Sequence, residues 1–323
     1  MRPIVLLSRV ADALYWISRY LERAEHTARV VGVVVDIGLG RAGAETETGA
    51  ISRLYGSLGL PPVAAPGQLG AFAAAALFDL TNQNSVVSCL TAARENARQV
   101  REEISADMWE QLNALFLRIR QLHADQAHGS RTHFVSRAVI DGIHLFQGTT
   151  DGTMAHGEGW QYLRAGRYIE RAGTTAALVE AFVADPMGGA DAEPLDRADW
   201  VALLRACAAL EAYSRHYTAD VRPERVAEFL LLNGEFPRSV RFAAAAIESA
   251  LLDLGRRSGR RAGGRVERLS GRLHAALDYG QVDEILDQDP RGYLLDIASQ
   301  CAQIHAALYQ TYVTYPIESA LPA

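Results

Sequence analysis

A six-residue motif occurs twice in the chain and constrains its fold more than any other feature. Arg-Tyr-Leu-Glu-Arg-Ala covers residues 19–24, and Arg-Tyr-Ile-Glu-Arg-Ala covers residues 167–172. The second copy follows the first by 148 residues (170 − 22, from the two glutamates), close to half of the 323-residue chain. A repeat with so long a period indicates two similar structural units. We therefore expect one domain over 1–323, built by internal duplication from the halves 1–150 and 151–323.

Apolar residues around the first copy recur with the spacing of an α-helix. They lie three or four positions apart and therefore share one helix face. The residues of this face are Leu14, Ile17, Leu21, Ala24, Ala28, Val31 and Val35. The pattern begins near Ser8 and ends near Ile37, where a glycine-rich segment follows. Because glycine commonly ends helices, we predict one long buried helix over 8–37.

The rest of the chain shows the same helical periodicity, and strand-like alternation does not persist. First-half helices are predicted over 46–58, 68–79, 84–104, 106–123 and 131–147. A turn-rich segment over 148–159 is expected to join the halves. Second-half helices are predicted over 158–183, 199–218, 223–233, 237–255, 262–279 and 290–314. The expected fold class is all-α, a multi-helix bundle of two similar six-helix halves.

A second pair of segments extends the correspondence between the halves. Asn84-Ser85-Val86 in the first half and Arg238-Ser239-Val240 in the second are each followed by a similar apolar run. The repeat is therefore not confined to the Glu-Arg motif.

The charge of the chain limits the partners that it can bind. The net charge is −6, so no general electrostatic affinity for nucleic acid is expected. All 32 basic residues are arginine. The chain therefore has neither a lysine for Schiff-base chemistry nor the lysine of a phosphate-binding loop.

Cysteine usage and hydropathy indicate the compartment. Cys89, Cys207 and Cys301 are scattered and form no Cys-x-x-Cys pair, which favours a reducing environment and buried, unreactive thiols. Arg9 and Asp12 interrupt the first apolar run too early for a signal peptide. No stretch of about 18 apolar residues exists, so no membrane span is expected. We expect a cytoplasmic protein.

The polar side of the first helix carries the candidate binding residues. Arg19, Glu22 and His26 step by three or four residues and share a face. We add the corresponding residues of the second copy and an acid at the start of the second long helix. The candidates are Arg19, Glu22, Arg23, His26, Arg167, Glu170, Arg171 and Glu158. An acid such as Glu158 also stabilises a helix N-terminus through the helix dipole, which is the simpler interpretation.

Two interpretations of the Glu-Arg motif follow from this pattern. In the structural one, the two motif helices pair Glu22 with Arg171 and Glu170 with Arg23, and these buried pairs fix their register. In the functional one, the same side chains line a cleft that holds a polar or anionic ligand, which suits the planar guanidinium group.

A metal-assisted site is a further alternative. Glu22 and His26 are four residues apart on a helix, and Glu25 lies beside them. Paired di-metal bundles instead use Glu-x-x-His twice, and no histidine here has a glutamate three positions earlier. We therefore predict neither a metal nor a cofactor.

Several blocks of the chain resemble the bacterial alpha-E family, named for an α-helical domain with a Glu-Arg motif in its first helix. The opening block runs from Leu7-Ser8-Arg9 through the first motif. The further blocks are 93–98 with 108–110, 158–172, and 225–230 with 235–240. The ordered set covers nearly the whole chain. The second copy departs from the family at Gly173, where similar proteins tend to have an acid.

The resemblance implies a role in amide chemistry. Members of the family are often encoded beside a circularly permuted ATP-grasp ligase and a transglutaminase-like protein. The chain is therefore expected to be a helical partner of an ATP-grasp amide ligase in peptide synthesis or modification, acting through an Arg/Glu-lined cleft. The alternatives are a stand-alone, metal-assisted enzyme using Glu22, Glu25 and His26, and a structural scaffold with buried Glu-Arg pairs.

Overall fold

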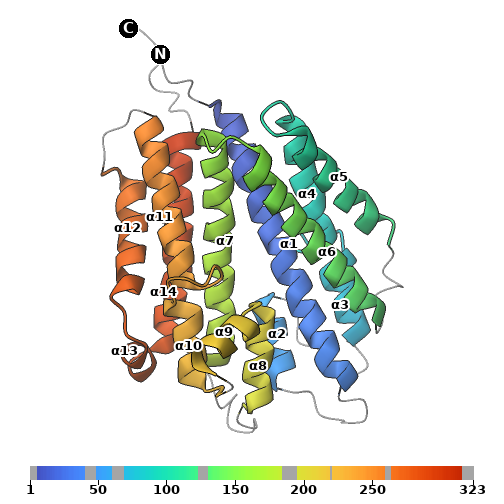
Figure 1. Cartoon of the computed structure of the whole chain (residues 1–323), viewed down its shortest axis with the longest axis vertical. Helices are drawn as coiled ribbons and strands as arrows, with labels where there is room; N and C mark the ends of the chain where they lie inside the picture. Colours follow the sequence, from blue (N-terminus) through green and yellow to red (C-terminus); the bar gives the residue numbers. More distant parts are fainter. Residues whose placement is uncertain are drawn as a thin grey trace.

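Two long helices lie side by side at the centre of the molecule. They are α1 (Ser8–Gly40) and α7 (Glu158–Val183), and each begins shortly before a copy of the motif (Figure 1). The computed structural model describes residues 6–40, 49–59, 69–122, 130–183, 195–218, 220–258 and 263–314. These residues form an all-α bundle and contain no β-strand.

The other helices surround this central pair. Those of the first half are α2 (Gly49–Ser57), α3 (Leu69–Phe78), α4 (Val86–Gln99), α5 (Ala106–Arg120) and α6 (Ser130–Thr153). Those of the second half are α8 (Arg197–Ala206), α9 (Leu210–Tyr217), α10 (Pro223–Leu232), α11 (Val240–Arg257), α12 (Arg265–Asp278), α13 (Val282–Asp287) and α14 (Pro290–Leu308). A π-helical turn, Tyr309–Val313, extends α14.

Each central helix carries flanking helices from its own half. Helices α4 and α6 pack on α1, while α11 and α14 pack on α7. Outside these, α5 packs on α4 and α6, and α12 packs on α11 and α14. The packing therefore follows a similar plan in both halves. Descent of the halves from one duplicated unit stays a prediction of the sequence.

Corresponding serines begin the two helices that flank the motif. The Ser85 hydroxyl accepts a hydrogen bond from the Ser88 backbone N–H, and the Ser239 hydroxyl accepts one from that of Phe242. Each serine satisfies a backbone donor that the first helical turn leaves without an acceptor. Both caps belong to the Asn84 and Arg238 segments that the sequence aligned.

A glycine lets the central helices approach one another closely. A Cβ atom at Gly166 would lie 2.3 Å from the Tyr15 carbonyl oxygen and 2.5 Å from Ser18 Oγ. Because both distances are far below van der Waals contact, only glycine fits here without a shift of α1. Ser18 is the counterpart of Gly166 in the first copy, so the helices meet at small residues of the repeated segment.

The predicted apolar face of the first helix is confirmed. All seven of its residues are buried, and Leu14, Ile17, Ala24, Ala28 and Val31 are completely enclosed. This face forms the middle of the core between α4, α6 and α7. Its burial supplies the hydrophobic free energy that holds α1 in place.

Several helix predictions differ from the structure. The helix expected over 84–104 ends at Gln99, and α1 continues past 37 to Gly40. Helix α6 continues beyond 147 to Thr153, and the Thr150 and Thr153 hydroxyls each donate to the carbonyl four residues earlier. The helix expected over 199–218 divides into α8 and α9 at Ala208, whose φ is 51°. Helix α13 was not predicted. The described residues of the second half thus form eight helices rather than six. Residues 46–48, 68, 123 and 262 of the predicted ranges lie outside the described residues.

Candidate functional site

The two copies of the motif bind each other across the α1–α7 interface. Arg171 of α7 donates from Nε to Glu22 Oε1 at 2.6 Å and from Nη2 to Glu22 Oε2 at 2.7 Å. Reciprocally, Arg23 of α1 donates from Nε to Glu170 Oε1 at 2.6 Å. The side chains of Glu22 and Arg171 are 1% and 7% exposed. The structure therefore contains both ion pairs expected from the structural interpretation.

Glu170 is held by two arginines rather than one. Arg19 donates from Nε to Glu170 Oε2 at 2.8 Å, in addition to the contact from Arg23. Burial favours the neutral acid, but the adjacent Arg19 and Arg23 outweigh it, so the pKa of Glu170 lies below its ordinary value. Glu170 is therefore a fixed carboxylate of the helix interface.

Glu25 forms a second cluster one turn further along α1. Its Oε1 atom accepts from Arg29 Nη2 at 2.7 Å, lies 2.9 Å from His144 Nε2 on α6, and accepts from Arg238. Burial acts to raise the pKa of Glu25, but Arg238, His144 and Arg29 hold it well below its usual range. Arg238 also reaches Glu22 Oε1 at 3.4 Å, so it joins the two clusters.

His26 is buried beside these ion pairs without joining them. Within the described residues, no hydrogen bond involves its imidazole, and burial lowers its pKa to about 4. The ring is therefore neutral at physiological pH. A catalytic histidine that accepts protons usually has a pKa near the operating pH, and His26 does not.

The structure does not bring two of the predicted residues to this cluster. Arg167 is half-buried and takes part in none of the motif's ion pairs within the described residues. Glu158 accepts a hydrogen bond from the Leu6 backbone N–H at 3.1 Å, at the start of α7. Twelve helical residues separate Glu158 from Glu170, a rise of about 18 Å. Glu158 thus fixes the beginning of α1 against α7 and lies outside the cluster.

The metal alternative finds no support in this arrangement. Both carboxylate oxygens of Glu22 and the Oε1 atom of Glu25 accept hydrogen bonds from arginine, which holds these three oxygens in ion pairs. No group of three or more metal-ligating side chains occurs in the part of the chain that the structure describes. Glu22, Glu25 and His26 therefore do not form the ligand set that this alternative requires.

A cavity of about 230 Å³ opens between α1, α7 and α14. Its polar residues are Arg19, Glu170, Thr174 and His305, and its apolar wall is Ile169, Ala298, Cys301 and Ala302, with Gly173 on α7. Arg19 and Glu170 are the motif residues that line it. Glu22 and Arg171, in contrast, are enclosed between helices. That a cleft of Arg and Glu side chains binds a partner or substrate stays a prediction.

Tyr15 links Arg19 to His305 above this cavity. Arg19 Nη1 donates to the Tyr15 hydroxyl at 3.2 Å, and this hydroxyl lies 2.8 Å from His305 Nδ1. Burial raises the pKa of Tyr15 to about 12 and lowers that of His305. The tyrosine stays protonated and the histidine neutral. Neither His305 nor Cys301 was predicted as a site residue, because α14 follows the second motif by more than a hundred residues.

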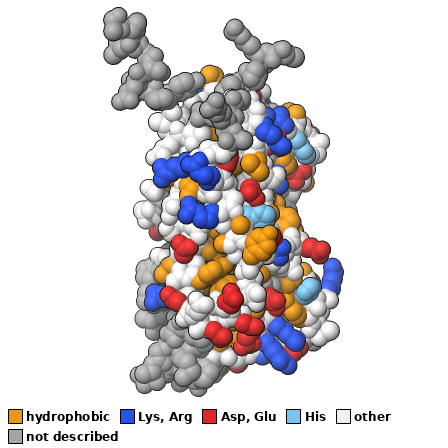
Figure 2. All heavy atoms as spheres, turned by 90° about the vertical axis from the view of Figure 1, so that its left-hand side faces the viewer, with side chains coloured by type: hydrophobic (Ala, Val, Ile, Leu, Met, Phe, Trp, Pro, Cys, Tyr) orange, Lys and Arg blue, Asp and Glu red, His pale blue; other side chains and the backbone are white. Residues whose placement is uncertain are grey.

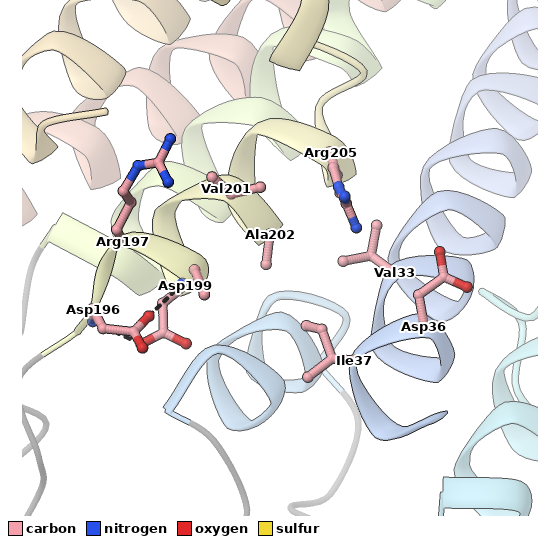
Figure 3. A pocket seen from close by; sticks show the side chains of 10 residues that line it. Val33, Asp36, Ile37, Asp196, Arg197, Asp199, Val201, Ala202 and Arg205 are labelled. Carbon is pink, nitrogen blue, oxygen red and sulfur yellow. Dashed lines mark hydrogen bonds between the residues drawn. The ribbon is translucent and has the colours of Figure 1, made fainter. Parts of the chain in front are cut away.

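Two larger openings lie away from the motif. One, of about 680 Å³, lies between the end of α1 and α8, where Val33, Ile37 and Arg205 face it (Figure 3). Asp196 and Asp199 on its rim form the capping box of α8, so their carboxylates accept hydrogen bonds from backbone N–H groups at the start of that helix. The other, of about 570 Å³, lies between α12, α13 and α14. Figure 2 faces this side of the molecule and shows acidic side chains among apolar ones on its lower part.

The fold and the site define an all-α domain whose two central helices are joined by a repeated Glu-Arg motif. The chain belongs to the Alpha-E family, described as a predicted alpha-helical domain with a conserved ER motif, whose model matches residues 6–313. The matched residues include both Glu-Arg pairs, Glu22-Arg23 and Glu170-Arg171.

Relatives of known sequence occur in mycobacteria. An uncharacterized protein of Mycobacterium bovis is 27% identical over 327 residues, which covers 93% of this chain and 35% of the relative. An uncharacterized protein of Mycobacterium tuberculosis strain H37Rv is 26% identical over the same shares. The chain therefore spans about a third of the length of these relatives. No solved structure matches the chain.

No described helix could span a membrane. Even the longest, α1, lacks the combination of length and apolar character that crossing a bilayer requires, and the same holds for every other described helix.

Proposed function

We propose that the chain is a helical partner of an ATP-grasp amide ligase in peptide synthesis or modification. In this proposal the Glu-Arg motif is the internal frame of the domain, and partner contacts lie elsewhere on its surface. The observation that supports the framework role is the reciprocal pairing of Glu22 with Arg171 and of Arg23 with Glu170. The choice of partner rests on the family resemblance. Both motif carboxylates are satisfied within the chain, so neither needs a partner to balance its charge.

The environment of the carboxylates supports a framework role over a catalytic one. A general acid or base works best with a pKa near the operating pH. The arginines hold the pKa values of Glu170 and Glu25 below their ordinary values instead. Removing one member of a buried pair leaves an uncompensated charge, which makes such pairs strong determinants of helix register.

Two observations support a role as one component of a larger system. The family resemblance implies a genetic association with a circularly permuted ATP-grasp ligase and a transglutaminase-like protein. In the mycobacterial relatives, the matched stretch is 35% of the chain, so a similar domain there is joined to further sequence. A domain that occurs covalently attached to other segments is suited to act beside partners.

Co-purification from the native host tests this proposal. The protein carrying a removable tag is expressed at its natural level, and the proteins retained with it are identified by mass spectrometry. We expect an ATP-grasp ligase among the enriched proteins, and addition of the purified chain should increase ATP-dependent amide formation by that ligase. Absence of any ATP-grasp protein from repeated purifications of the folded chain would contradict the proposal.

A variant of the motif distinguishes a structural role of its ion pairs from a role in binding the partner. Glu170→Gln weakens the interface between α1 and α7 but changes no residue of the outer surface. At temperatures where the variant remains folded, the proposal predicts wild-type retention of the ligase. Lost retention by a folded Glu170→Gln protein would instead place the partner contact on the motif.

A further inference from the structure

The second half lacks the carboxylate that the first half buries next to its motif. Glu25 stands three residues after Glu22, and its counterpart three residues after Glu170 is Gly173. Glu25 is completely buried among Arg29, Arg238 and His144. At Gly173 a Cβ atom would meet no other atom within 4 Å. The position that holds an acid in one half is thus open space in the other.

This open space is the cavity of about 230 Å³ between α1, α7 and α14. Gly173 lies on its α7 side and His305 on its α14 side. In the first half, His144 of α6 contacts Glu25 of α1 across the corresponding pair of packed helices. The cavity therefore has a histidine and an arginine on its wall. The carboxylate that lines it among the described residues, Glu170, is already bound by Arg19 and Arg23.

Arg19 has donor capacity left in this cavity. Its Nε and Nη2 atoms contact Glu170, and Nη1 donates to Tyr15. A guanidinium group carries two hydrogens on each terminal nitrogen, so one on each remains without an acceptor among the described residues. Its side chain is 15% exposed, which leaves the group reachable from the cavity.

His305 presents a second donor. The Tyr15 hydroxyl accepts from Arg19, so its own proton is directed to His305 Nδ1, 2.8 Å away. An imidazole that accepts at Nδ1 carries its proton on Nε2 when neutral. No acceptor for Nε2 occurs within the described residues, and His305 lines the cavity. The cavity is thus supplied with two kinds of N–H donor.

The charge of the buried network favours an anion. At the cavity, the single carboxylate of Glu170 is bound by two arginines, Arg19 and Arg23. The excess of positive charge contrasts with the net charge of −6 of the whole chain. Positive charge in a poorly solvated site attracts a negative ligand strongly.

We propose that this cavity binds a small carboxylate, whose charged group takes the place of the acid missing at Gly173. Arg19 and His305 donate to the carboxylate, and its short aliphatic part packs on Ile169, Ala298 and Ala302. The cavity admits a short acid or the side chain of a peptide glutamate or aspartate. The proposal goes beyond the ligase partnership and does not depend on it, because it rests on the geometry of one cavity.

Titration calorimetry with propionate and propionamide tests the proposal on the full chain. The amide has the same shape but lacks the charge. We expect propionate to bind at least about tenfold more tightly than propionamide, since hydrogen bonds to a charged acceptor are the stronger ones. An N-acetylated, C-amidated glutamate measured in parallel identifies the source: tighter binding than propionate indicates a peptide side chain, and weaker binding indicates a free acid. Equal binding of propionate and propionamide would overturn the proposal.

Two variants at one position complete the test. Gly173→Glu places a carboxylate in the cavity and should weaken propionate binding at least about tenfold. Gly173→Ala adds only a methyl group and should retain the wild-type affinity. Thermal unfolding of both variants verifies that they are folded. Wild-type affinity in the folded Gly173→Glu protein would contradict the proposal, even if an ATP-grasp ligase co-purifies with the chain.

Discussion

Arg171 of α7 donates hydrogen bonds to both carboxylate oxygens of Glu22 on α1, with N–O distances of 2.6 and 2.7 Å. The third nitrogen of the same guanidinium, Nη1, donates to the Pro237 carbonyl oxygen at 3.1 Å, just before α11 begins. One side chain therefore fixes α1, α7 and the start of α11 relative to one another. Bidentate geometry of this kind specifies both distance and orientation.

Removal of the Glu170 charge should destabilise the fold. Glu170→Gln leaves Arg19 and Arg23 without their shared carboxylate, and breaking a buried pair in this way costs about 3 kcal/mol or more. The free energy of unfolding measured in urea should fall by that amount. Asp141→Asn is the matched control, because its pair with Arg137 is exposed and contributes less than about 1 kcal/mol. Equal losses in the two variants would refute a special role for the interface.

Two glycines of α7 should respond oppositely to alanine. At Gly166 the new methyl group would overlap the Tyr15 carbonyl, so we expect a loss of about 1–3 kcal/mol as α1 shifts. At Gly173 the methyl group meets open space, and the helix gains up to about 1 kcal/mol from the better helix former. Thermal unfolding of the two variants measures the difference. A tolerated Gly166→Ala would disprove the close approach of α1 and α7.

His26 should make the stability fall with decreasing pH. Its pKa is near 6.5 in the unfolded chain and is lowered to about 4 by burial in the folded one. Between these values the unfolded chain binds the proton first, so this contribution is complete above pH 6.5 and is lost as the pH falls towards 4. The lost free energy amounts to about 3 kcal/mol. Urea unfolding at pH 7.5 and 4.5 should show a smaller drop in His26→Leu; an unchanged drop would contradict the burial of a neutral ring.

The native thiols should be unreactive. Cys89, Cys207 and Cys301 are free and buried, and burial raises the pKa of each to about 12. Because the thiolate is the reactive form, Ellman's reagent at pH 8 should modify them only after unfolding in denaturant. Rapid modification of one thiol in the native protein would reveal a reactive cysteine and reopen a nucleophilic role.

The central helices and their ion pairs were predictable because their signals are local. The residues of α7 carry helical periodicity without interruption, and the predicted 158–183 coincides with Glu158–Val183. The motif repeat relates Glu22 to Glu170 and Arg23 to Arg171, and a twofold arrangement of the two helices then implies reciprocal pairs. Periodicity and repetition together contain this information.

Other features depend on contacts between distant segments. The break between α8 and α9 occurs at Ala208, in an alanine-rich run that carries no proline or glycine. Helix α6 passes through Gly148 and Gly152, which read as turn residues in isolation. Arg238 contacts Glu25 from a loop more than two hundred residues away in the sequence. The alignment of Arg238 with Asn84 was the one sequence feature that related it to the motif. Tertiary packing overrides local propensity at such positions.

The repeated motif holds the two halves of the domain together. A double-mutant cycle tests this role most directly: urea unfolding of Glu22→Ala, Arg171→Ala, the double variant and the wild type. We predict a coupling energy of about 2 kcal/mol or more between the two side chains, because they are buried and share two short hydrogen bonds. A coupling energy below about 0.5 kcal/mol would contradict the claim.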